Sequence, residues 1–261
     1  MNTVIVPVDF SETSLHAARY AAQLLSGHYG VTLVLYHSYA KAAEAEEVNS
    51  KLEELMAELM KDRILKMEVL AHEEADFVDG LEKAARHRKA DLVIMGITGR
   101  SAIAQVFFGS NTLKMAERKA CPVLIVPENA PFSTLKNVML TSDFKSTINT
   151  TPTKPLKDIL DVFKPHLHIV NVDKDHYISL TEEYENEKQE MAKMFAAYDP
   201  QFYFMRLYDV DEAINLFAES RNIDLIIVIQ KNRSFIDKLL NSSRTKTLSY
   251  HSKMPILIMH E

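Results

Sequence analysis

The sequence is poor in cysteine and tryptophan, and it has no long apolar run. Its single cysteine, Cys121, excludes an internal disulfide and is typical of a reducing compartment. Without tryptophan, it offers no indole platform for a sugar or a membrane. No apolar run approaches the ~20 residues that span a bilayer, and the N-terminal residues lack the basic and apolar regions of a signal peptide. We therefore expect a cytoplasmic chain with no membrane partner.

The sequence also has no excess of positive charge. The 261 residues carry 30 Lys and Arg against 36 Asp and Glu, which gives a formal net charge of −6. Because general nucleic-acid binding usually depends on a basic surface, we expect no nucleic-acid partner. Hydrophobic residues make up 47% of the chain, which is ample for the cores of one large domain or two ordinary ones.

Several enzyme signatures are missing. There is no G-x4-G-K-[S/T], so no lysine is placed to stabilise phosphoryl transfer, and no dinucleotide fingerprint G-x-G-x-x-G. No Ser-His-Asp or Cys-His set has a supporting context, and Cys121 precedes a proline and a buried strand. The sequence supplies no catalytic residue, which favours binding over fast turnover.

Strands and helices alternate in the first half of the chain. Ser11 and Asp76 are expected to cap helices, and the helix over Ala42–Lys61 has an apolar stripe of Leu52, Leu55, Met56, Leu59 and Met60. The order β-α-β-α-β-α-β-α-β predicts a doubly wound parallel sheet, with a ligand beyond the carboxyl ends of its strands. The five expected strands are Met1–Val8, Val31–Tyr36, Ile64–Leu70, Leu92–Met95 and Pro122–Val126.

Three of only six glycines lie between Asp91 and Thr112. Gly96 and Gly99 follow a buried strand, and Gly109 directly precedes Ser110, where a helical pattern begins. Glycine lets a ligand approach the backbone closely, and a helix N-terminus favours phosphate. Each feature alone is more commonly a plain turn or helix cap.

The spacing of these glycines, G-x2-G-x9-G-[S/T], resembles the nucleotide-binding signature of the universal stress protein family. The strand before the motif and the helix after it stand where that family has them. The resemblance implies a Rossmann-like, adenine nucleotide alpha hydrolase-like domain that binds ATP or a similar adenine nucleotide, with or without magnesium.

The pattern of the first half occurs again in the second half. Asp143-Phe144 repeats Asp9-Phe10 134 positions later, and D-L-I-I-V-I at Asp224 repeats D-L-V-I-M-G 133 positions after Asp91. Repetition at this scale indicates two copies of one domain. We therefore expect two tandem doubly wound α/β domains over residues 1–128 and 135–261, each with a five-stranded parallel sheet and helices on both faces, joined by a Pro- and Ser-containing linker.

The second copy has lost the signature. In place of the three glycines it has Ile229, Asn232 and Ser242. His166 and His168 lie two apart on one predicted strand, a spacing open to a metal site, but no third ligand stands at metal-like spacing and packing is the better interpretation.

The family resemblance assigns binding roles residue by residue to the first copy. Asp9 would contact adenine, ribose or a magnesium ion, and Ser38, or its neighbour His37, would lie at the adenine edge through backbone groups. Thr98 is smaller than the polar aromatic or imidazole residue of many relatives, and Arg100 suits an anion or is an ordinary surface arginine. The implied set is Pro7, Val8, Asp9, Ser38, Met95, Gly96, Thr98, Gly99, Arg100, Gly109, Ser110, Asn111 and Thr112.

The leading hypothesis is a stress-response regulator that binds ATP in its first domain. Its second domain would act as a built-in partner, because relatives pair through their last strands; here Val123–Val126 would meet Ile256–Met259 in a pseudo-dimer, with a homodimer as a further assembly. The alternatives are an interaction scaffold of the same fold that binds no nucleotide, and a slow ATP hydrolase or ligase-like enzyme.

Overall fold

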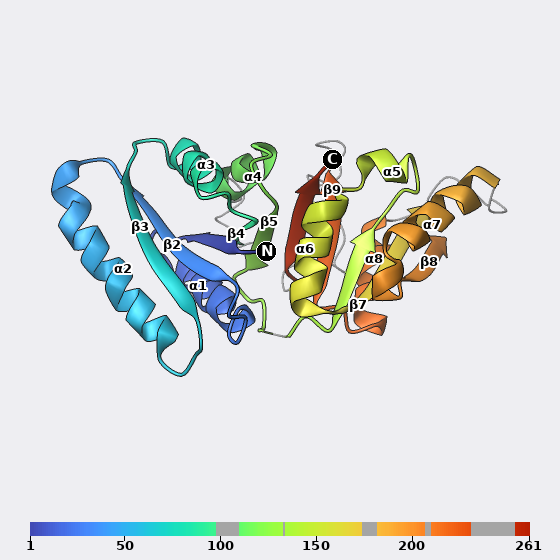
Figure 1. The fold of residues 1–261 in the computed structure, drawn as a ribbon, viewed down its shortest axis with the longest axis horizontal. Coiled ribbons are helices and arrows are strands. Elements are labelled where there is room, and N and C mark those ends of the chain that lie inside the picture. Colours follow the sequence, from blue (N-terminus) through green and yellow to red (C-terminus); the bar gives the residue numbers. More distant parts are fainter. Residues whose placement is uncertain (98–109, 133, 174–181, 207–209, 231–253) are drawn as a thin grey trace. The chain divides into compact units, whose positions relative to one another are not determined.

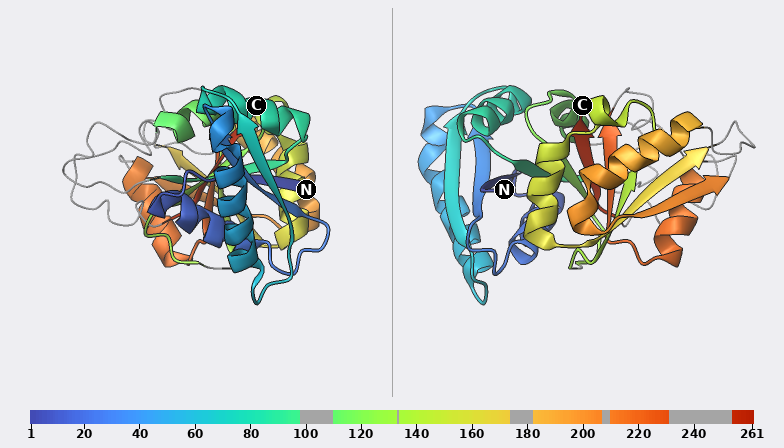
Figure 2. Two further views of the ribbon diagram at one scale, coloured as in Figure 1. Left: turned by 90° about the vertical axis from the view of Figure 1, so that its left-hand side faces the viewer. Right: turned by 45° about the vertical axis from the view of Figure 1, so that its right-hand side comes forward.

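The computed structural model describes residues 1–97, 110–132, 134–173, 182–206, 210–230 and 254–261. The chain divides into two compact units, Met1–Phe132 and Ser133–Glu261. Each unit is an α/β domain in which helices flank a parallel sheet (Figures 1 and 2). The expected doubly wound fold is confirmed.

The first unit has the sheet order β3-β2-β1-β4-β5, and all its strands are parallel. Its elements in chain order are β1 (Thr3–Pro7), α1 (Glu12–Leu24), β2 (Thr32–Tyr39), the 3₁₀ turn η1 (Ala42–Glu44), α2 (Ala45–Met60), β3 (Lys66–Glu73), α3 (Phe77–His87), β4 (Leu92–Ile97), α4 (Ser110–Glu117) and β5 (Val123–Pro127).

The direction of chain travel places the helices of this unit on two faces. The chain moves outward from β1 to β3, returns, and continues from β4 to β5, so right-handed crossovers put α1 and α2 on one face and α3 and α4 on the other. Neighbouring side chains of β2 show the two faces: Tyr36 contacts Phe77 of α3, whereas the His37 ring contacts Phe10 on the opposite side. The order reverses between β1 and β4, which makes that point the topological switch.

The predicted helix caps are confirmed. The Ser11 hydroxyl accepts the Ser14 N–H at the start of α1, and the Asp76 carboxylate accepts the Val78 and Asp79 N–H groups at the start of α3. After α1, Gly27 adopts a φ of +86°, which an L side chain tolerates poorly.

The apolar stripe of α2 differs from the one expected. Its buried residues are Val48, Leu52, Leu55 and Leu59, while Met56 is only half-buried and Met60 is 40% exposed. The buried set keeps one angular position on the helix, whereas Met56 and Met60 fall to its side. Their flexible, weakly polar side chains accept that boundary position.

The second unit has the order β8-β7-β6-β9-β10, again with parallel strands only. Its elements are β6 (Asn137–Thr141), α5 (Thr147–Thr150), α6 (Thr153–Phe163), β7 (His166–Asp173), α7 (Glu182–Met194), η2 (Ala196–Tyr198), β8 (Gln201–Arg206), α8 (Val210–Ser220), β9 (Leu225–Gln230) and β10 (Ile256–His260). The first helix of the first unit thus has a counterpart that is split into α5 and α6.

One aspartate in each unit holds the entrance of the central strand. Asp91, just before β4, accepts the N–H groups of Asn2 and Thr3 at 2.6 and 3.0 Å. Asp224, just before β9, accepts those of Lys136 and Asn137 at 2.8 and 2.9 Å. The repeated Asp of the D-L-[V/I]-I motif therefore fixes the start of the neighbouring strand, at the edge opposite the expected site.

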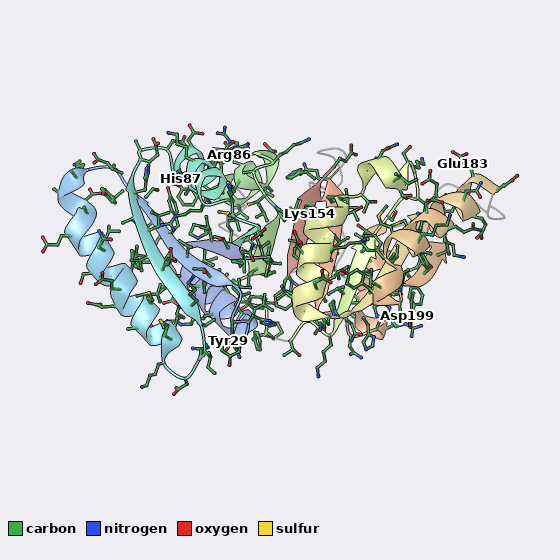
Figure 3. The ribbon with its side chains drawn as sticks, viewed as in Figure 1. Tyr29, Arg86, His87, Lys154, Glu183 and Asp199 are labelled. Atoms are coloured by element: carbon green, nitrogen blue, oxygen red, sulfur yellow. The ribbon has the colours of Figure 1, made fainter. Side chains whose placement is uncertain are left out.

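Polar side chains cover the surface of each unit (Figure 3). Arg86 and Lys154 lie at the surface with 57% and 85% of their side chains exposed, and each pairs with a carboxylate of its own helix. Tyr29 is 76% exposed. Among the described residues, no helix combines the length and the apolar character needed to cross a membrane.

Candidate functional site

The carboxyl ends of β1, β2 and β4 form one edge of the first sheet. β1 lies between its two partners, with Pro7 opposite Tyr36 of β2 and Val4 opposite Leu92 of β4. Among the predicted site residues, Pro7, Val8 and Met95 are buried at this edge and Ser38 is half-buried. Because the switch point between β1 and β4 opens here, this edge has the geometry at which doubly wound sheets bind ligands.

Asp9 follows β1 and is exposed, and its own turn holds its carboxylate. The Ser11 N–H and hydroxyl donate to Asp9 Oδ1 at 3.0 and 2.6 Å, and the Asp9 N–H donates to Ser14 Oγ at 3.2 Å. Burial acts to raise the pKa of Asp9, but the hydrogen bonds that Asp9 makes with Ser11 and Ser14 outweigh it and hold the pKa below its ordinary value. Such a carboxylate can accept ribose hydroxyls or ligate magnesium.

Phe10 takes a backbone conformation that is rare for a bulky residue. Its φ is +62°, in the left-handed region, where a side chain costs about 1–2 kcal/mol. The centroids of the Phe10 and His37 rings lie 5.3 Å apart, and the Lys51 ammonium lies 5.8 Å from the centroid of the Phe10 ring. Strain of this kind persists only where neighbouring contacts enforce it, and it gathers at binding and catalytic sites.

The His37 side chain ties the end of β2 to the residue after β1. Its Nδ1 lies 2.5 Å from the Val8 carbonyl oxygen. A carbonyl only accepts hydrogen bonds, so Nδ1 must be the donor, which leaves Nε2 of the neutral ring as the acceptor. From the sequence only backbone groups are expected here. The imidazole contact is not predictable, because no local pattern indicates a partner 29 residues away.

Gly96 lies inside β4, and the structure gives it a packing role. A Cβ at this position would come within 2.5 Å of the Thr13 carbonyl oxygen and 2.7 Å of its methyl group. The absence of a side chain therefore lets the first turn of α1 approach β4. This contact gives Gly96 a packing role, and the ligand contact expected from the sequence stays a prediction.

The start of α4 carries the remaining described residues of the predicted set. Ser110 is its first residue and Asn111 is exposed. Thr112 is 3% exposed, and its hydroxyl donates to the Gly96 carbonyl at 3.1 Å. The proton of this hydroxyl is therefore bonded to β4. The other predicted phosphate-side residues lie outside the described residues; they are Thr98, Gly99, Arg100 and Gly109.

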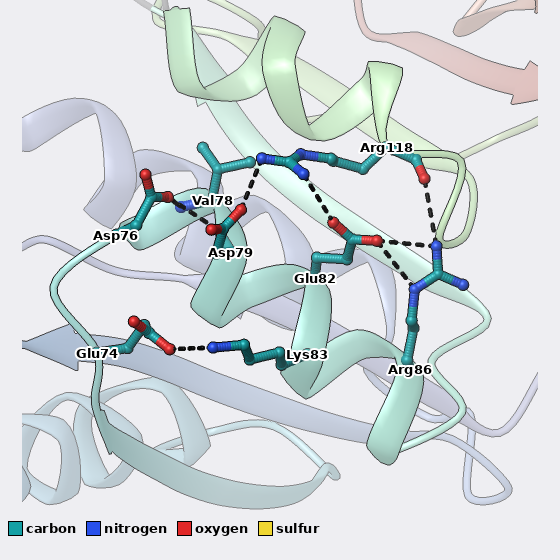
Figure 4. Close-up of polar contacts among 8 residues, drawn as sticks. All are labelled: Glu74, Asp76, Val78, Asp79, Glu82, Lys83, Arg86 and Arg118. Atoms are coloured by element: carbon teal, nitrogen blue, oxygen red, sulfur yellow. Dashed lines mark hydrogen bonds and ion pairs between the residues drawn. The ribbon is translucent and has the colours of Figure 1, made fainter.

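Charged side chains fix the far end of α4 against α3 (Figure 4). Arg118, just after α4, donates to Asp79 at 2.6 Å and pairs with Glu82 at 3.4 Å. Glu82 also binds Arg86, which reaches the Arg118 carbonyl. Arg118 and Asp79 are 44% and 45% exposed, so each pair contributes little alone, but the network restrains the direction in which the α4 N-terminus points.

The second unit repeats the turn after the first strand. The Lys145 N–H donates to Asp143 Oδ1 at 3.1 Å, and Phe144 has a φ of +49°. Here Asn171 takes the place of the imidazole: its Nδ2 donates to the Ser142 carbonyl at 2.8 Å. The strained Asp-Phe turn is thus a property of both units.

The surroundings of that turn differ in the second unit. The Glu187 carboxylate of α7 accepts the Thr147 N–H at 2.8 Å and its hydroxyl at 2.6 Å, so a side chain of the protein occupies the start of α5. The Tyr184 ring packs 5.5 Å from that of Phe144. Ile229 stands in β9 where β4 has Gly96, and the first helix breaks at Thr151-Pro152. We infer that a side chain at 229 prevents the close approach seen in the first unit.

Comparison with known proteins decides the family. The model of the universal stress protein family matches residues 1–127 and 165–260. The chain belongs to the universal stress protein family. This membership supports a role in the stress response.

Two curated relatives each match about half of this universal stress protein. One, from Methanocaldococcus jannaschii, is 26% identical over 136 residues, which are 47% of this chain and 80% of the relative. The other, from Thermus aquaticus, is 28% identical over 136 residues, 48% of this chain and 97% of the relative. Both are named universal stress proteins. A match of half the chain agrees with two copies of one domain.

Solved structures match the universal stress protein over its whole length. One from Archaeoglobus fulgidus covers 99% of this chain and 98% of its own, at a TM-score of 0.69 and 18% identity. Another, from Pseudomonas aeruginosa, covers 100% of this chain and 93% of its own, at a TM-score of 0.60 and 13% identity. These likenesses concern the fold. The family match in the second unit begins at residue 165, after α5 and α6, the two short helices that correspond to the single helix α1 of the first unit.

Cys121 and His168, two reactive side chains in the described part of this universal stress protein, are poorly placed for chemistry. Burial, with Asp91 adding to it, raises the pKa of the Cys121 thiol to about 12, so little thiolate forms at neutral pH. His168 is 6% exposed and packs against Tyr203 and Phe217, while His166 is exposed. Within the described part of the chain, no three metal-ligating side chains are grouped to hold an ion.

Proposed function

We propose that the first unit binds ATP, or a similar adenine nucleotide, and that this binding serves a regulatory role in the stress response. The observation that carries the proposal is the carboxyl edge of β1, where Asp9 keeps a lowered pKa in a strained turn beside the switch point. The glycine signature that ends at Ser110 supports it from the sequence, because α4 begins there and a helix N-terminus favours phosphate.

Asp9 would face the sugar or a magnesium ion. Its Oδ1 already accepts two hydrogen bonds from Ser11, so the second carboxylate oxygen is the one that a ribose hydroxyl or a metal would use. If magnesium binds here, the Asp9 carboxylate would be one of its oxygen ligands, and the ion would offset the negative charge of the phosphates. The backbone at Ser38 would lie along the adenine edge.

The test is a calorimetric titration of Mg–ATP into the intact chain and two matched variants. Asp9→Asn keeps an oxygen that can accept the Ser11 N–H but removes the charge, and we expect it to weaken binding at least about tenfold, or about 1.4 kcal/mol. Asp143→Asn makes the same change in the same turn of the second unit and should bind like the wild type. Equal affinities for all three, or no binding to the wild type, would remove the nucleotide from the proposal.

The second unit, with Ile229 and Glu187 at its corresponding edge, would bind no nucleotide and would serve as partner of the first. From the sequence, we propose that Val123–Val126 and Ile256–Met259 pair within one chain. Cysteines introduced one into each of these two segments should then cross-link within one chain, whereas cross-links between chains would indicate that the strands pair between protomers.

A further inference from the structure

A side chain on the second strand holds the carbonyl of the residue after the first strand in both units. In the first unit the Val8 N–H donates to the Tyr36 carbonyl at 2.8 Å, and one residue further on His37 Nδ1 meets the Val8 carbonyl at 2.5 Å. The backbone group and the side chain together bind both polar groups of Val8.

The second unit builds the same clamp from a different residue. The Ser142 N–H donates to the Val170 carbonyl at 3.0 Å, and Asn171 Nδ2 donates to the Ser142 carbonyl at 2.8 Å. Since Asn171 lies 134 positions after His37, as Asp143 does after Asp9, imidazole and amide occupy one structural position. What they share is a single N–H donor aimed at that carbonyl.

The clamp lies directly before the strained turn. Phe10 and Phe144, two residues after the clamped carbonyl, have φ of +62° and +49°. A phenylalanine keeps a left-handed backbone conformation only where neighbouring contacts hold the backbone in place. Here the clamped carbonyl restrains the backbone before the aspartate, and the hydrogen-bonded turn of the aspartate restrains the backbone after it. In the first unit the His37 ring also packs on Phe10, so one side chain restrains both flanks of Asp9.

We infer that His37 is a positioning residue of the nucleotide site: by holding the Val8 carbonyl it fixes the Asp9–Phe10 turn and so sets the direction of the Asp9 carboxylate. This inference rests on the proposed function where it concerns the nucleotide, but the clamp itself can be tested without one. His37 has this role through its N–H donor, so an amide of similar reach should replace it.

Two substitutions separate this donor from the volume of the ring. His37→Leu keeps apolar bulk and removes the donor, which leaves the Val8 carbonyl without its partner. His37→Asn copies the second unit. Asn171→Leu removes the donor of the second clamp and serves as the matched control, since it lies in the other unit.

The first readout needs no nucleotide: the pKa of Asp9, followed by NMR. In His37→Leu the turn loosens, the hydrogen bonds of Asp9 with Ser11 and Ser14 weaken, and the pKa of Asp9 should move up toward its ordinary value. In His37→Asn and Asn171→Leu it should stay lowered. An unchanged Asp9 pKa in a folded His37→Leu variant would overturn the inference.

The second readout is the affinity for Mg–ATP. We expect His37→Leu to lose about tenfold or more, His37→Asn to recover most of the loss, and Asn171→Leu to bind as the wild type does. If the wild type binds and His37→Leu binds equally well, the positioning role is refuted while the proposed function stands. If the wild type binds no adenine nucleotide, the proposed function fails, and the Asp9 pKa still decides whether the clamp acts. Loss in His37→Leu without recovery in His37→Asn would assign the effect to the ring and refute the donor argument.

Discussion

Replacing Gly96 by alanine should destabilise the first unit through a single backbone contact. The added Cβ would lie 2.5 Å from the Thr13 carbonyl oxygen and 3.0 Å from its carbonyl carbon. Ordinary contact begins near 3.4 Å, so the first turn of α1 would have to retreat by about 1 Å from β4. Four of the seven buried residues of that helix are alanines, among them Ala17, Ala18 and Ala21, so few of its side chains are long enough to repack and fill the gap.

The expected cost follows from core overpacking. Extra volume in a packed core costs about 1–3 kcal/mol. Replacing a glycine also lowers the conformational entropy of the unfolded chain, which stabilises the folded protein by about 0.4–1 kcal/mol. We therefore expect Gly96→Ala to lower the free energy of unfolding by about 1–2 kcal/mol, measured by urea denaturation with circular dichroism. Hydrogen exchange of α1 and β4 peptides would assign the loss to the first unit.

Two control variants separate the backbone contact from the other effects of replacing a glycine. Gly30→Ala adds a Cβ that meets nothing within 4 Å, so it should be neutral or slightly stabilising. Thr13→Ala removes the methyl group at 2.7 Å but leaves the carbonyl, so it should not rescue Gly96→Ala. If Gly96→Ala is as stable as Gly30→Ala, or if Thr13→Ala restores it, the backbone-contact explanation is wrong.

Three further predictions concern stability. Asp91→Ala removes the acceptor of two N–H groups at the start of β1 and should lower the free energy of unfolding by about 1–3 kcal/mol in urea denaturation. Asp224→Ala should give a similar loss in the second unit. An unchanged free energy of unfolding in both variants would show that water replaces the carboxylate. Thr112→Val removes the hydroxyl that donates to the Gly96 carbonyl while keeping the shape, and should cost about 1 kcal/mol by the same assay; an unchanged midpoint would contradict a role for that bond in holding α4. Burial, with repulsion from nearby cations, lowers the pKa of His168 below its ordinary value of 6.5, so the unfolded state takes up the proton first: stability should be full above about pH 6.5 and fall as the pH drops below it. His168→Phe should flatten that part of the pH profile of melting temperature, and an unchanged slope would exclude His168 as its source.

The repeat of the Asp-Phe pair illustrates what sequence patterns could predict. Asp9-Phe10 and Asp143-Phe144 marked the two copies, and both pairs form the same turn after the first strand of their unit. The caps at Ser11 and Asp76 were also predictable, because capping depends on residues within one helical turn. The boundary of the α2 stripe was not, since Met56 and Met60 suit either a core or its margin.

The site was only partly predictable, because several of its contacts join residues that are far apart in the sequence. Spacing placed Asp9 and Ser38 at strand ends, and the fold puts them at one edge. The glycine spacing also predicted that Gly96 approaches a ligand, which stays a prediction, and its contact with the Thr13 carbonyl could not be read from the sequence. Thr112 was expected among phosphate ligands, and its hydroxyl is bonded to β4.

The sequence by itself determined the alternation of strands and helices, the two copies and the loss of glycines from the second, because these depend on residue order and local conformational preference. Only the tertiary structure decided that His37 clamps Val8, that Gly96 admits Thr13, and that Glu187 occupies the start of α5. Each of these contacts joins segments 29 to 83 residues apart, and such partners are set by how helices and strands pack, which no short-range pattern records.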